Sequence, residues 1–162
     1  MNNIFCIIFK SPIGIISIEG TKNGICKLSI LKRYFKENLD IEIKNIPPLI
    51  TKSLKQLQEY FNGKRKLFSI SFDFLNGTEF EKKVWNALLE IPYGTTSTYK
   101  LIAIKIKKPK SFRAVGNAIG KNPIPIIIPC HRIIREDGKL GGFSSGIEIK
   151  KKLLKLEKVK FA

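Results

Sequence analysis

The pattern of apolar and polar positions predicts a small β-sheet at the start of the chain. Ser11-Pro12 and Asn23-Gly24, the second a pair typical of tight hairpin turns, interrupt a series of short runs rich in β-branched residues. The predicted strands cover residues 4–9, 13–18 and 25–30. The spacing of the turns favours strands that follow one another directly.

One helix and one further strand complete the first half of the chain. Residues 32–46 are polar and irregular, and Pro47-Pro48 then opens a helix that continues to about Asn62. The apolar positions of this helix form one stripe, which indicates that one side is buried. Alternation over residues 67–74 predicts a last strand, and Asn76-Gly77 after it marks a domain boundary.

The second half has helical rather than alternating periodicity, so we expect a structural α/β domain over residues 1–76 and a separate domain over residues 77–162. Thr78 and Glu81 have the spacing of a capping box and open a helix with an apolar side. The last helix of the chain is also amphipathic, and Glu157 lies near its end.

Between these two helices, two shorter ones are predicted. The first begins near Ser97 or Thr98 and stops before Pro109, and Ser111 is expected to cap the second, which runs to Gly120. Two short helices joined by a tight, proline-containing turn after a longer helix are the pattern of a helix-turn-helix.

An apolar run flanked by prolines follows, and a cysteine comes after it. Because proline fixes φ and donates no N–H, we interpret residues 124–128 as a buried extended segment. Cys130 comes next, beside the only histidine, His131. A thiol at the edge of the core with a base beside it is typical of a reactive cysteine. A packing cysteine next to a surface histidine is the alternative that this dipeptide alone leaves open.

The charge of the chain narrows the class of partner. The formal net charge is +17 at pH 7, which predicts attraction to polyanions. The half with the helix-turn-helix holds 18 Lys and Arg against 7 Asp and Glu, while the first half holds 12 against 6. No predicted helix has a basic amphipathic face with aromatic anchors, so nucleic acid is favoured over a membrane surface.

Neither export nor a membrane span is predicted. The start of the chain lacks a basic leader, and no apolar stretch approaches the roughly 20 residues of a membrane helix. Three cysteines, an odd number, do not form a disulfide framework, and we interpret Cys6 and Cys26 as packing residues. We therefore expect a cytoplasmic, intracellular protein. We also expect a monomer.

Three motifs together carry a resemblance to a known family. Arg113-Ala114-Val115-Gly116, Asn122-Pro123 and Pro129-Cys130-His131-Arg132 resemble the signature of the O6-alkylguanine-DNA alkyltransferases, the methylated-DNA–protein-cysteine methyltransferases. The resemblance covers roughly residues 78–158. It implies an α+β protein with an N-terminal ribonuclease-H-like α/β domain and a C-terminal winged helix-turn-helix alkyltransferase domain.

The family implies a chemistry as well as a fold. Its members transfer an alkyl group irreversibly from O6-alkylguanine in DNA to their own cysteine, with no cofactor, and O4-alkylthymine is a further candidate substrate. By resemblance Cys130 is the acceptor, His131 deprotonates it through a water, and Glu157 orients the imidazole. Tyr99 turns a phosphate and donates a proton to the departing guanine. The histidines of the zinc site of some relatives are missing, so no metal is expected.

The resemblance also implies how double-stranded DNA is held. The helix-turn-helix contacts the minor groove, the alkylated base is flipped out, and Arg113 takes its place in the stack. The DNA-binding residues implied are Tyr99, Arg113, Ala114, Gly116, Asn122 and Arg132. The pocket residues implied are Pro125, Ile133, Phe143, Ser144, Ser145 and Lys150.

Two departures and two alternatives qualify this interpretation. Phe143 stands where many members have Tyr, and Ser145 stands where many have Gly, so a side chain at 145 would crowd bulky O6 substituents. A non-enzymatic lesion-binding protein of the alkyltransferase-like type would lack the acceptor cysteine, but Cys130 is present. A Cys-His hydrolase would leave the helix-turn-helix and the basic charge unexplained.

Overall fold

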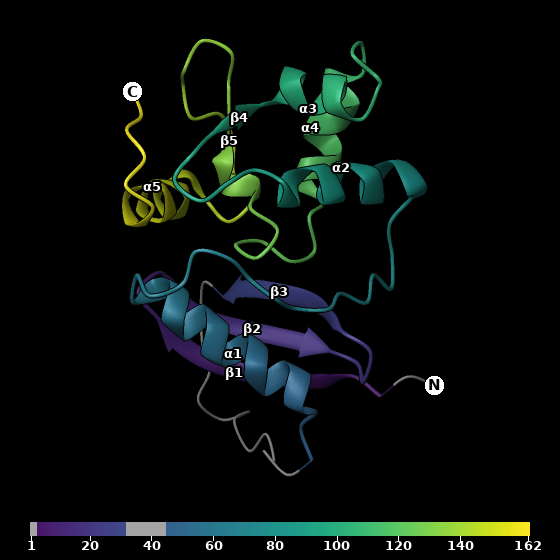
Figure 1. Ribbon diagram of the computed structural model, residues 1–162, viewed down its shortest axis with the longest axis vertical. Coiled ribbons are helices and arrows are strands. Elements are labelled where there is room, and N and C mark those ends of the chain that lie inside the picture. Colours follow the sequence, from purple (N-terminus) through teal and green to yellow (C-terminus); the bar gives the residue numbers. More distant parts are fainter. Residues whose placement is uncertain (1–2, 32–44) are drawn as a thin grey trace. The chain divides into compact units, whose positions relative to one another are not determined.

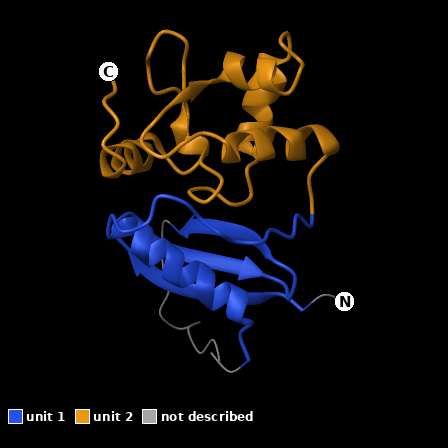
Figure 2. Cartoon of the chain, viewed as in Figure 1, with its two compact units in different colours: residues 1–75 blue, residues 76–162 orange. Residues whose placement is uncertain are grey.

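The chain forms two compact units. The structure, a computed structural model, describes residues 3–31 and 45–162. The units are Met1–Leu75 and Asn76–Ala162, coloured separately in Figure 2. Their division lies one residue before the boundary expected from Asn76-Gly77. Most of the stretch predicted to be irregular, residues 32–44, lies outside the described residues.

The first unit contains an antiparallel sheet of three strands in the order β1-β2-β3 (Figure 1). The three predicted strands are confirmed as β1 (Phe5–Ser11), β2 (Gly14–Gly20) and β3 (Ile25–Leu31). Ser11 and Gly14 close the first turn, where the Ser11 hydroxyl donates to the Gly14 carbonyl and Gly14 has a φ of +124°.

Helix α1 (Pro48–Phe61) lies across this sheet, as Figure 1 shows, and confirms the predicted helix. Pro48 occupies its first turn, where the missing N–H has no intrahelical partner in any case. Ile50, Leu57 and Tyr60 are fully buried, so the apolar stripe seen in the sequence is the side that packs on the strands.

The strand predicted over residues 67–74 is wrong, because only Phe72 forms a bridge there, a parallel one to Ile25. Upstream, the Ser69 N–H donates to the side-chain oxygen of Gln56 in α1 at 2.9 Å, so it takes a helix side chain as its partner. The alternation indicated a half-buried segment correctly, but its backbone groups bond outside a regular ladder.

The second unit opens with α2 (Glu79–Leu89), and the predicted capping box is confirmed. The Thr78 hydroxyl accepts from the Glu81 N–H at 3.1 Å, and the Glu81 carboxylate accepts from the Thr78 N–H at 2.9 Å. Trp85 points from α2 into the core and donates its indole N–H to the Ala118 carbonyl at 2.8 Å. Helix α2 is therefore attached to the helix pair that follows.

The predicted pair of short helices is present as α3 (Tyr99–Lys105) and α4 (Phe112–Gly120), which pack on each other and on α2. Thr98 caps α3 by accepting from the Leu101 N–H at 3.2 Å. Ser111 occupies the N-cap position of α4, but its side chain makes no capping hydrogen bond. The expected cap therefore exists by position only.

A short parallel pair, β4 (Ser97–Thr98) and β5 (Ile133–Ile134), links the start of α3 to the segment after the cysteine. The last helix, α5 (Ile147–Leu156), buries Leu153 and Leu154 and has Glu157 as its C-cap residue, as the sequence predicted. None of the described helices is both long and apolar enough to span a membrane.

The apolar run between the prolines, residues 124–128, is buried, as predicted, but it is not extended. Ile124, Ile126 and Ile128 are fully buried. The chain reverses between them, since the Ile128 N–H donates to the Ile124 carbonyl at 2.9 Å. Ile126 has a φ of +75°, a conformation that a β-branched residue seldom adopts. Three prolines prevent a ladder, and the hydrophobic side chains pack inward around a tight turn instead.

Candidate active site

Cys130 begins a single turn of 3-10 helix, η2 (Cys130–Arg132), at the end of the tight turn. Asn122 holds this turn from within: its side-chain amide donates to the Ile128 carbonyl at 2.8 Å, and its side-chain oxygen accepts from the Ile124 N–H at 3.0 Å. The Cys130 N–H donates to the same Ile128 carbonyl at 2.8 Å. Asn122 and Cys130 are thus fixed to one main-chain oxygen.

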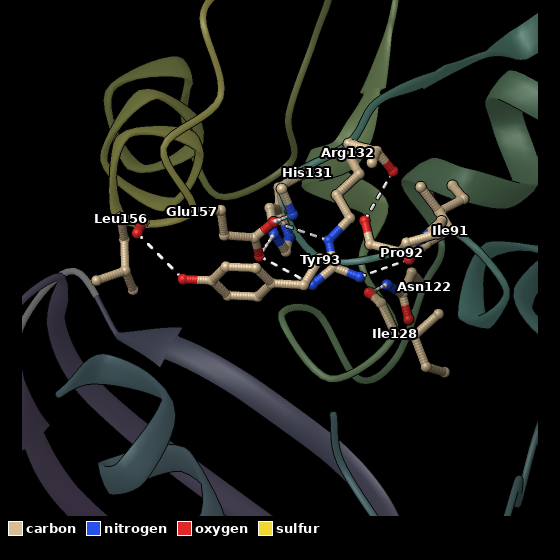
Figure 3. Close-up of polar contacts among 11 residues, drawn as sticks. Ile91, Pro92, Tyr93, Asn122, Ile128, His131, Arg132, Leu156 and Glu157 are labelled. Atoms are coloured by element: carbon tan, nitrogen blue, oxygen red, sulfur yellow. Dashed lines mark hydrogen bonds and ion pairs between the residues drawn. The ribbon is translucent and has the colours of Figure 1, made fainter. Parts of the chain in front are cut away.

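The residues after Cys130 point into a buried cluster of charges around Glu157, drawn in Figure 3. The Glu157 carboxylate lies 2.7 Å from Nε2 of His131, and it accepts from Nε and a terminal nitrogen of Arg132 at 2.9 and 3.0 Å. It also accepts from the Gly94 N–H at 3.2 Å. The cluster therefore joins η2, the loop after α2 and the end of α5.

Tyr93 and Ile91 complete this cluster from the loop after α2. Arg132 donates to the Ile91 carbonyl at 2.6 Å, and its guanidinium lies 5.8 Å from the centre of the Tyr93 ring. The Tyr93 hydroxyl donates to the Leu156 carbonyl at 3.1 Å. These contacts attach the loop to the last turn of α5, so the partners of His131 are fixed before any substrate arrives.

The ionisation of the cluster follows from its burial and its pairing. Burial alone would raise the pKa of Glu157, but hydrogen bonds from His131 and Arg132 hold it at about 2. Burial lowers the pKa of His131, and the nearby Glu157 opposes this only in part. The imidazole is therefore neutral near pH 7, with Nε2 as donor to the carboxylate. In the described part of the chain, Nδ1 of His131 is buried without a hydrogen-bond partner.

The thiol is protonated at rest. Burial raises the pKa of Cys130 to about 11, and the Asn122 side chain, the charge of Lys150 and nearby backbone N–H groups lower it only in part. Cys130 is 4% exposed, so a reagent can reach the thiol only through an opening beside it, and ionisation of the thiol would need a base within the protein.

That entrance is a cavity of about 220 Å³ beside the sulfur. It is lined by Tyr99, Gly116, Ile119, Gly120, Cys130, Gly142, Phe143 and Ser144. Gly116 of α4 lies beside the Tyr99 ring, and a Cβ there would be in ordinary contact with the ring at 3.7 Å. Burial raises the pKa of Tyr99, so its hydroxyl stays a hydrogen-bond donor at neutral pH.

The structure brings together some, but not all, of the residues implied for the site. Tyr99, Gly116, Cys130, Phe143 and Ser144 line the cavity, and His131, the residue after the cysteine, pairs with Glu157. Four residues expected in the pocket are not among those that line it: Pro125, Ile133, Ser145 and Lys150. Pro125, Ile133 and Lys150 are instead buried in the second unit.

The expectation that Arg132 contacts DNA is corrected by its surroundings. Its side chain is 6% exposed and bonds to Glu157 and to the Ile91 carbonyl, which leaves its donors inside the protein. Arg113 and Ala114, by contrast, are exposed on α4. The two arginines of the motifs thus serve different parts of the molecule, one the core and one the surface.

Sequence reasoning missed Ile119, Gly120 and Gly142 in the cavity and Tyr93 in the charge cluster. Ile119 and Gly120 lie three and four residues after Gly116, so helical spacing could have placed them on the same side of α4. No sequence signal marks Tyr93, which meets Arg132 only through the fold. In the described residues, no group of three or more His, Cys, Asp or Glu side chains could hold a metal ion.

Comparison with known proteins identifies relatives of both halves of the chain. Residues 4–74 match the ribonuclease-like domain of the 6-O-methylguanine DNA methyltransferases, and residues 79–159 match their DNA binding domain. The chain is 47% identical over 150 residues to a methylated-DNA–protein-cysteine methyltransferase of Methanosarcina barkeri, covering 93% of this chain and 94% of the relative.

The chain belongs to the methylated-DNA–protein-cysteine methyltransferase family. A homologue from Haemophilus influenzae with the same name is 38% identical over 99% of this chain and 90% of its own. The crystal structure of the Mycobacterium tuberculosis O6-methylguanine methyltransferase has a TM-score of 0.82 at 40% identity, covering 96% of this chain and 93% of that one. The same enzyme has been solved in complex with DNA, and that structure gives a TM-score of 0.81.

Membership confirms the α+β fold class, with a ribonuclease-like domain followed by a DNA-binding domain. It also confirms the predicted activity as that of an O6-methylguanine-DNA methyltransferase, a repair enzyme. The family resemblance had covered only residues 78–158, whereas the match extends over both domains.

Proposed function

We propose that Cys130 accepts the methyl group of O6-methylguanine in double-stranded DNA in a single, irreversible transfer. The observation that carries this proposal is that Cys130 lines the cavity and is followed directly in η2 by His131, whose imidazole pairs with the buried carboxylate of Glu157. The other cysteines, Cys6 and Cys26, lie on strands of the first unit, without a histidine.

The proton of the thiol leaves through His131. Nε2 of the imidazole donates to the buried carboxylate of Glu157, so the lone pair of Nδ1 is the acceptor. A water between Nδ1 and Sγ relays the proton, and Glu157 stabilises the imidazolium that results. A base is needed because burial keeps the thiol protonated, with its pKa raised to about 11.

The thiolate then attacks the methyl carbon in line with the O6–carbon bond. A sulfur–carbon bond forms, the carbon–oxygen bond breaks, and its electron pair goes to O6 of the guanine. Tyr99, whose hydroxyl remains a donor, lies on the wall of the same cavity and supplies a proton to the departing base. The Ser144 hydroxyl is a second donor there. The thioether has no route back to a thiol, so each molecule acts once.

DNA is held by the surface of α4. Arg113 and Ala114 are exposed on this helix, and Gly116 on the same helix lines the cavity. A base that reaches Cys130 has to leave the duplex, and Arg113 fills the gap from the minor groove. The net charge of +17 favours phosphate contacts, and the M. tuberculosis relative has been solved with DNA. All residues of the proposed site lie in one chain, so we propose a monomer. Because its substrate is DNA, we propose that it acts inside the cell.

Intact-protein mass after incubation with a duplex that contains O6-methylguanine tests this proposal. We expect the wild type to gain the mass of one methyl group in place of hydrogen, mapped to Cys130, and no more than one methyl to leave the DNA per protein molecule. Cys130→Ser should gain nothing, and the double variant Cys6→Ser/Cys26→Ser should behave as the wild type. Retained lesion binding without any gain in mass would favour the non-enzymatic alternative.

A further inference from the structure

Lys150 is buried in a way that lysine rarely is. It lies in α5, and its side chain is fully buried. Lysines are almost never fully buried without a partner, because removing an ammonium from water costs several kcal/mol unless its donors are satisfied. Burial in turn lowers its pKa to about 8. Burying this ammonium costs free energy, so we expect the ammonium to have a specific role.

The partners of this ammonium are three main-chain oxygens. Nζ of Lys150 donates to the carbonyls of Ile133 at 2.5 Å, Leu140 at 2.5 Å and Gly142 at 3.2 Å. An ammonium has three donors and no acceptor, so three carbonyls match it fully. A neutral amine would have only two N–H groups and would turn a lone pair towards one of the oxygens. The site is therefore built for the charged form.

Those three oxygens belong to the two segments that form the acceptor site. Ile133 directly follows η2, which carries Cys130, and pairs with Ser97 at the start of β4. Gly142 lines the cavity, and the next two residues of its loop, Phe143 and Ser144, line it as well. Lys150 thus connects the acceptor segment to the loop that lines the cavity.

We propose that Lys150 is a positioning residue for methyl transfer: its ammonium holds the loop of residues 140–144 against the acceptor segment, and its charge favours the Cys130 thiolate. The inference rests on the proposed role of Cys130. It differs from the pocket role that the family resemblance implied, since Lys150 acts on the cavity through main-chain oxygens and does not line it. Cys130 is the ionisable group whose charge acts on Lys150, and Lys150 in turn lowers the pKa of Cys130 and contributes to the lowered pKa of His131.

The variant Lys150→Met removes the ammonium and keeps a side chain of similar length. We expect its single-turnover methyl-transfer rate to fall about ten- to a hundredfold, because the wall is no longer held in place, while its affinity for the methylated duplex changes little. Lys152→Met, an exposed position on the same helix, is the matched control and should transfer at the wild-type rate. An unchanged rate in Lys150→Met would overturn the proposal.

A second readout separates positioning from folding. Alkylation of Cys130 by iodoacetamide, followed against pH without DNA, should need more alkaline solution in Lys150→Met than in the wild type. A variant that is only less stable would lower the midpoint of thermal unfolding and keep the wild-type alkylation profile, which would refute the role in the site. This readout does not depend on methyl transfer, so it stands apart from a failure of the proposed function.

The wild-type pH profile decides the question if Lys150→Met does not fold. Thiolate formation alone would make the transfer rate rise steadily with pH. Loss of the ammonium near its pKa of about 8 should instead level or reverse that rise. A rate that keeps rising well beyond this pH, on protein that remains folded by circular dichroism, would count against the proposal.

Discussion

The carboxylate of Glu157 lies 2.7 Å from Nε2 of His131, and both side chains are buried. Although 26 residues separate the two in the chain, this contact decides which nitrogen of the imidazole carries the proton. It leaves Nδ1, on the residue next to Cys130, as the nitrogen with the lone pair. The chemistry that we propose for the cysteine therefore depends on a residue at the far end of α5.

Replacing Glu157 by Gln should damage both stability and activity. The guanidinium of Arg132 would stay buried without its charged partner, at a cost of about 3–5 kcal/mol of unfolding free energy. Methyl transfer should fall at least about 100-fold, because the imidazolium loses its counter-ion. Urea unfolding and single-turnover rates measure the two effects. Glu148→Gln, an exposed carboxylate on the same helix, is the control and should change neither.

The stability of the protein should fall in acid in two stages. His131 has a folded pKa below its usual 6.5, so the unfolded state binds more protons and stability declines as the pH falls below about 6.5. Glu157 has a folded pKa of about 2 against an ordinary 4.5, so its contribution is present above pH 4.5 and is lost as the pH falls towards 2. The second stage amounts to about 3 kcal/mol.

The pKa of His131, which sets the first stage of the loss of stability in acid, can be measured directly by NMR, because the chain has a single histidine. Its ring-proton resonance should titrate below 6.5 in the folded protein and near 6.5 in urea. In Glu157→Gln the pKa should fall further, since the carboxylate is what raises it. A folded-state pKa above 6.5 would contradict the neutral imidazole on which the proposed proton transfer depends.

Substitutions of Arg113 and Arg132 should have different effects, the first on DNA binding and the second on stability. Arg113→Ala removes an exposed charge from α4, so it should weaken DNA binding. The slope of the logarithm of the binding constant against the logarithm of the salt concentration should become smaller by about one, with little change in urea unfolding. Arg132→Ala should cost about 3–5 kcal/mol of stability, since it leaves Glu157 buried with one cation fewer. DNA-binding titrations of both variants at several salt concentrations measure the two slopes, and urea unfolding measures the two stabilities. A reduced salt slope in folded Arg132→Ala would show that this arginine does reach DNA.

Gly77→Ala should be more harmful than Gly138→Ala, although both glycines have a positive φ. A Cβ on Gly77 would lie 2.6 Å from the Trp85 ring, whereas one on Gly138 would meet nothing within 4 Å. The backbone change alone costs about 1–2 kcal/mol, so Gly138→Ala sets the baseline and Gly77→Ala should exceed it. The fluorescence of Trp85, the only tryptophan, follows unfolding in both. Equal midpoints in urea would mean that the ring moves aside freely.

Local patterns predicted local structure well. The capping box of Thr78 and Glu81 and the apolar stripe of α1 depend on neighbours a few residues apart, and both were confirmed. The segment over residues 67–74 failed because its alternation reports burial, while a strand also needs partners for its backbone groups. Ser69 found one of those partners on Gln56, which no local pattern could reveal.

The sequence by itself determined the family, the acceptor candidate and most of the elements, because motifs, caps and periodicity all act over short distances along the chain. Only the tertiary structure decided that Arg132 serves the core, that Lys150 binds three carbonyls, and that the run before Cys130 is a tight turn. Each of these depends on which distant backbone groups come within hydrogen-bonding distance. A buried charge takes whichever partners the fold places beside it, and spacing along the chain does not specify them.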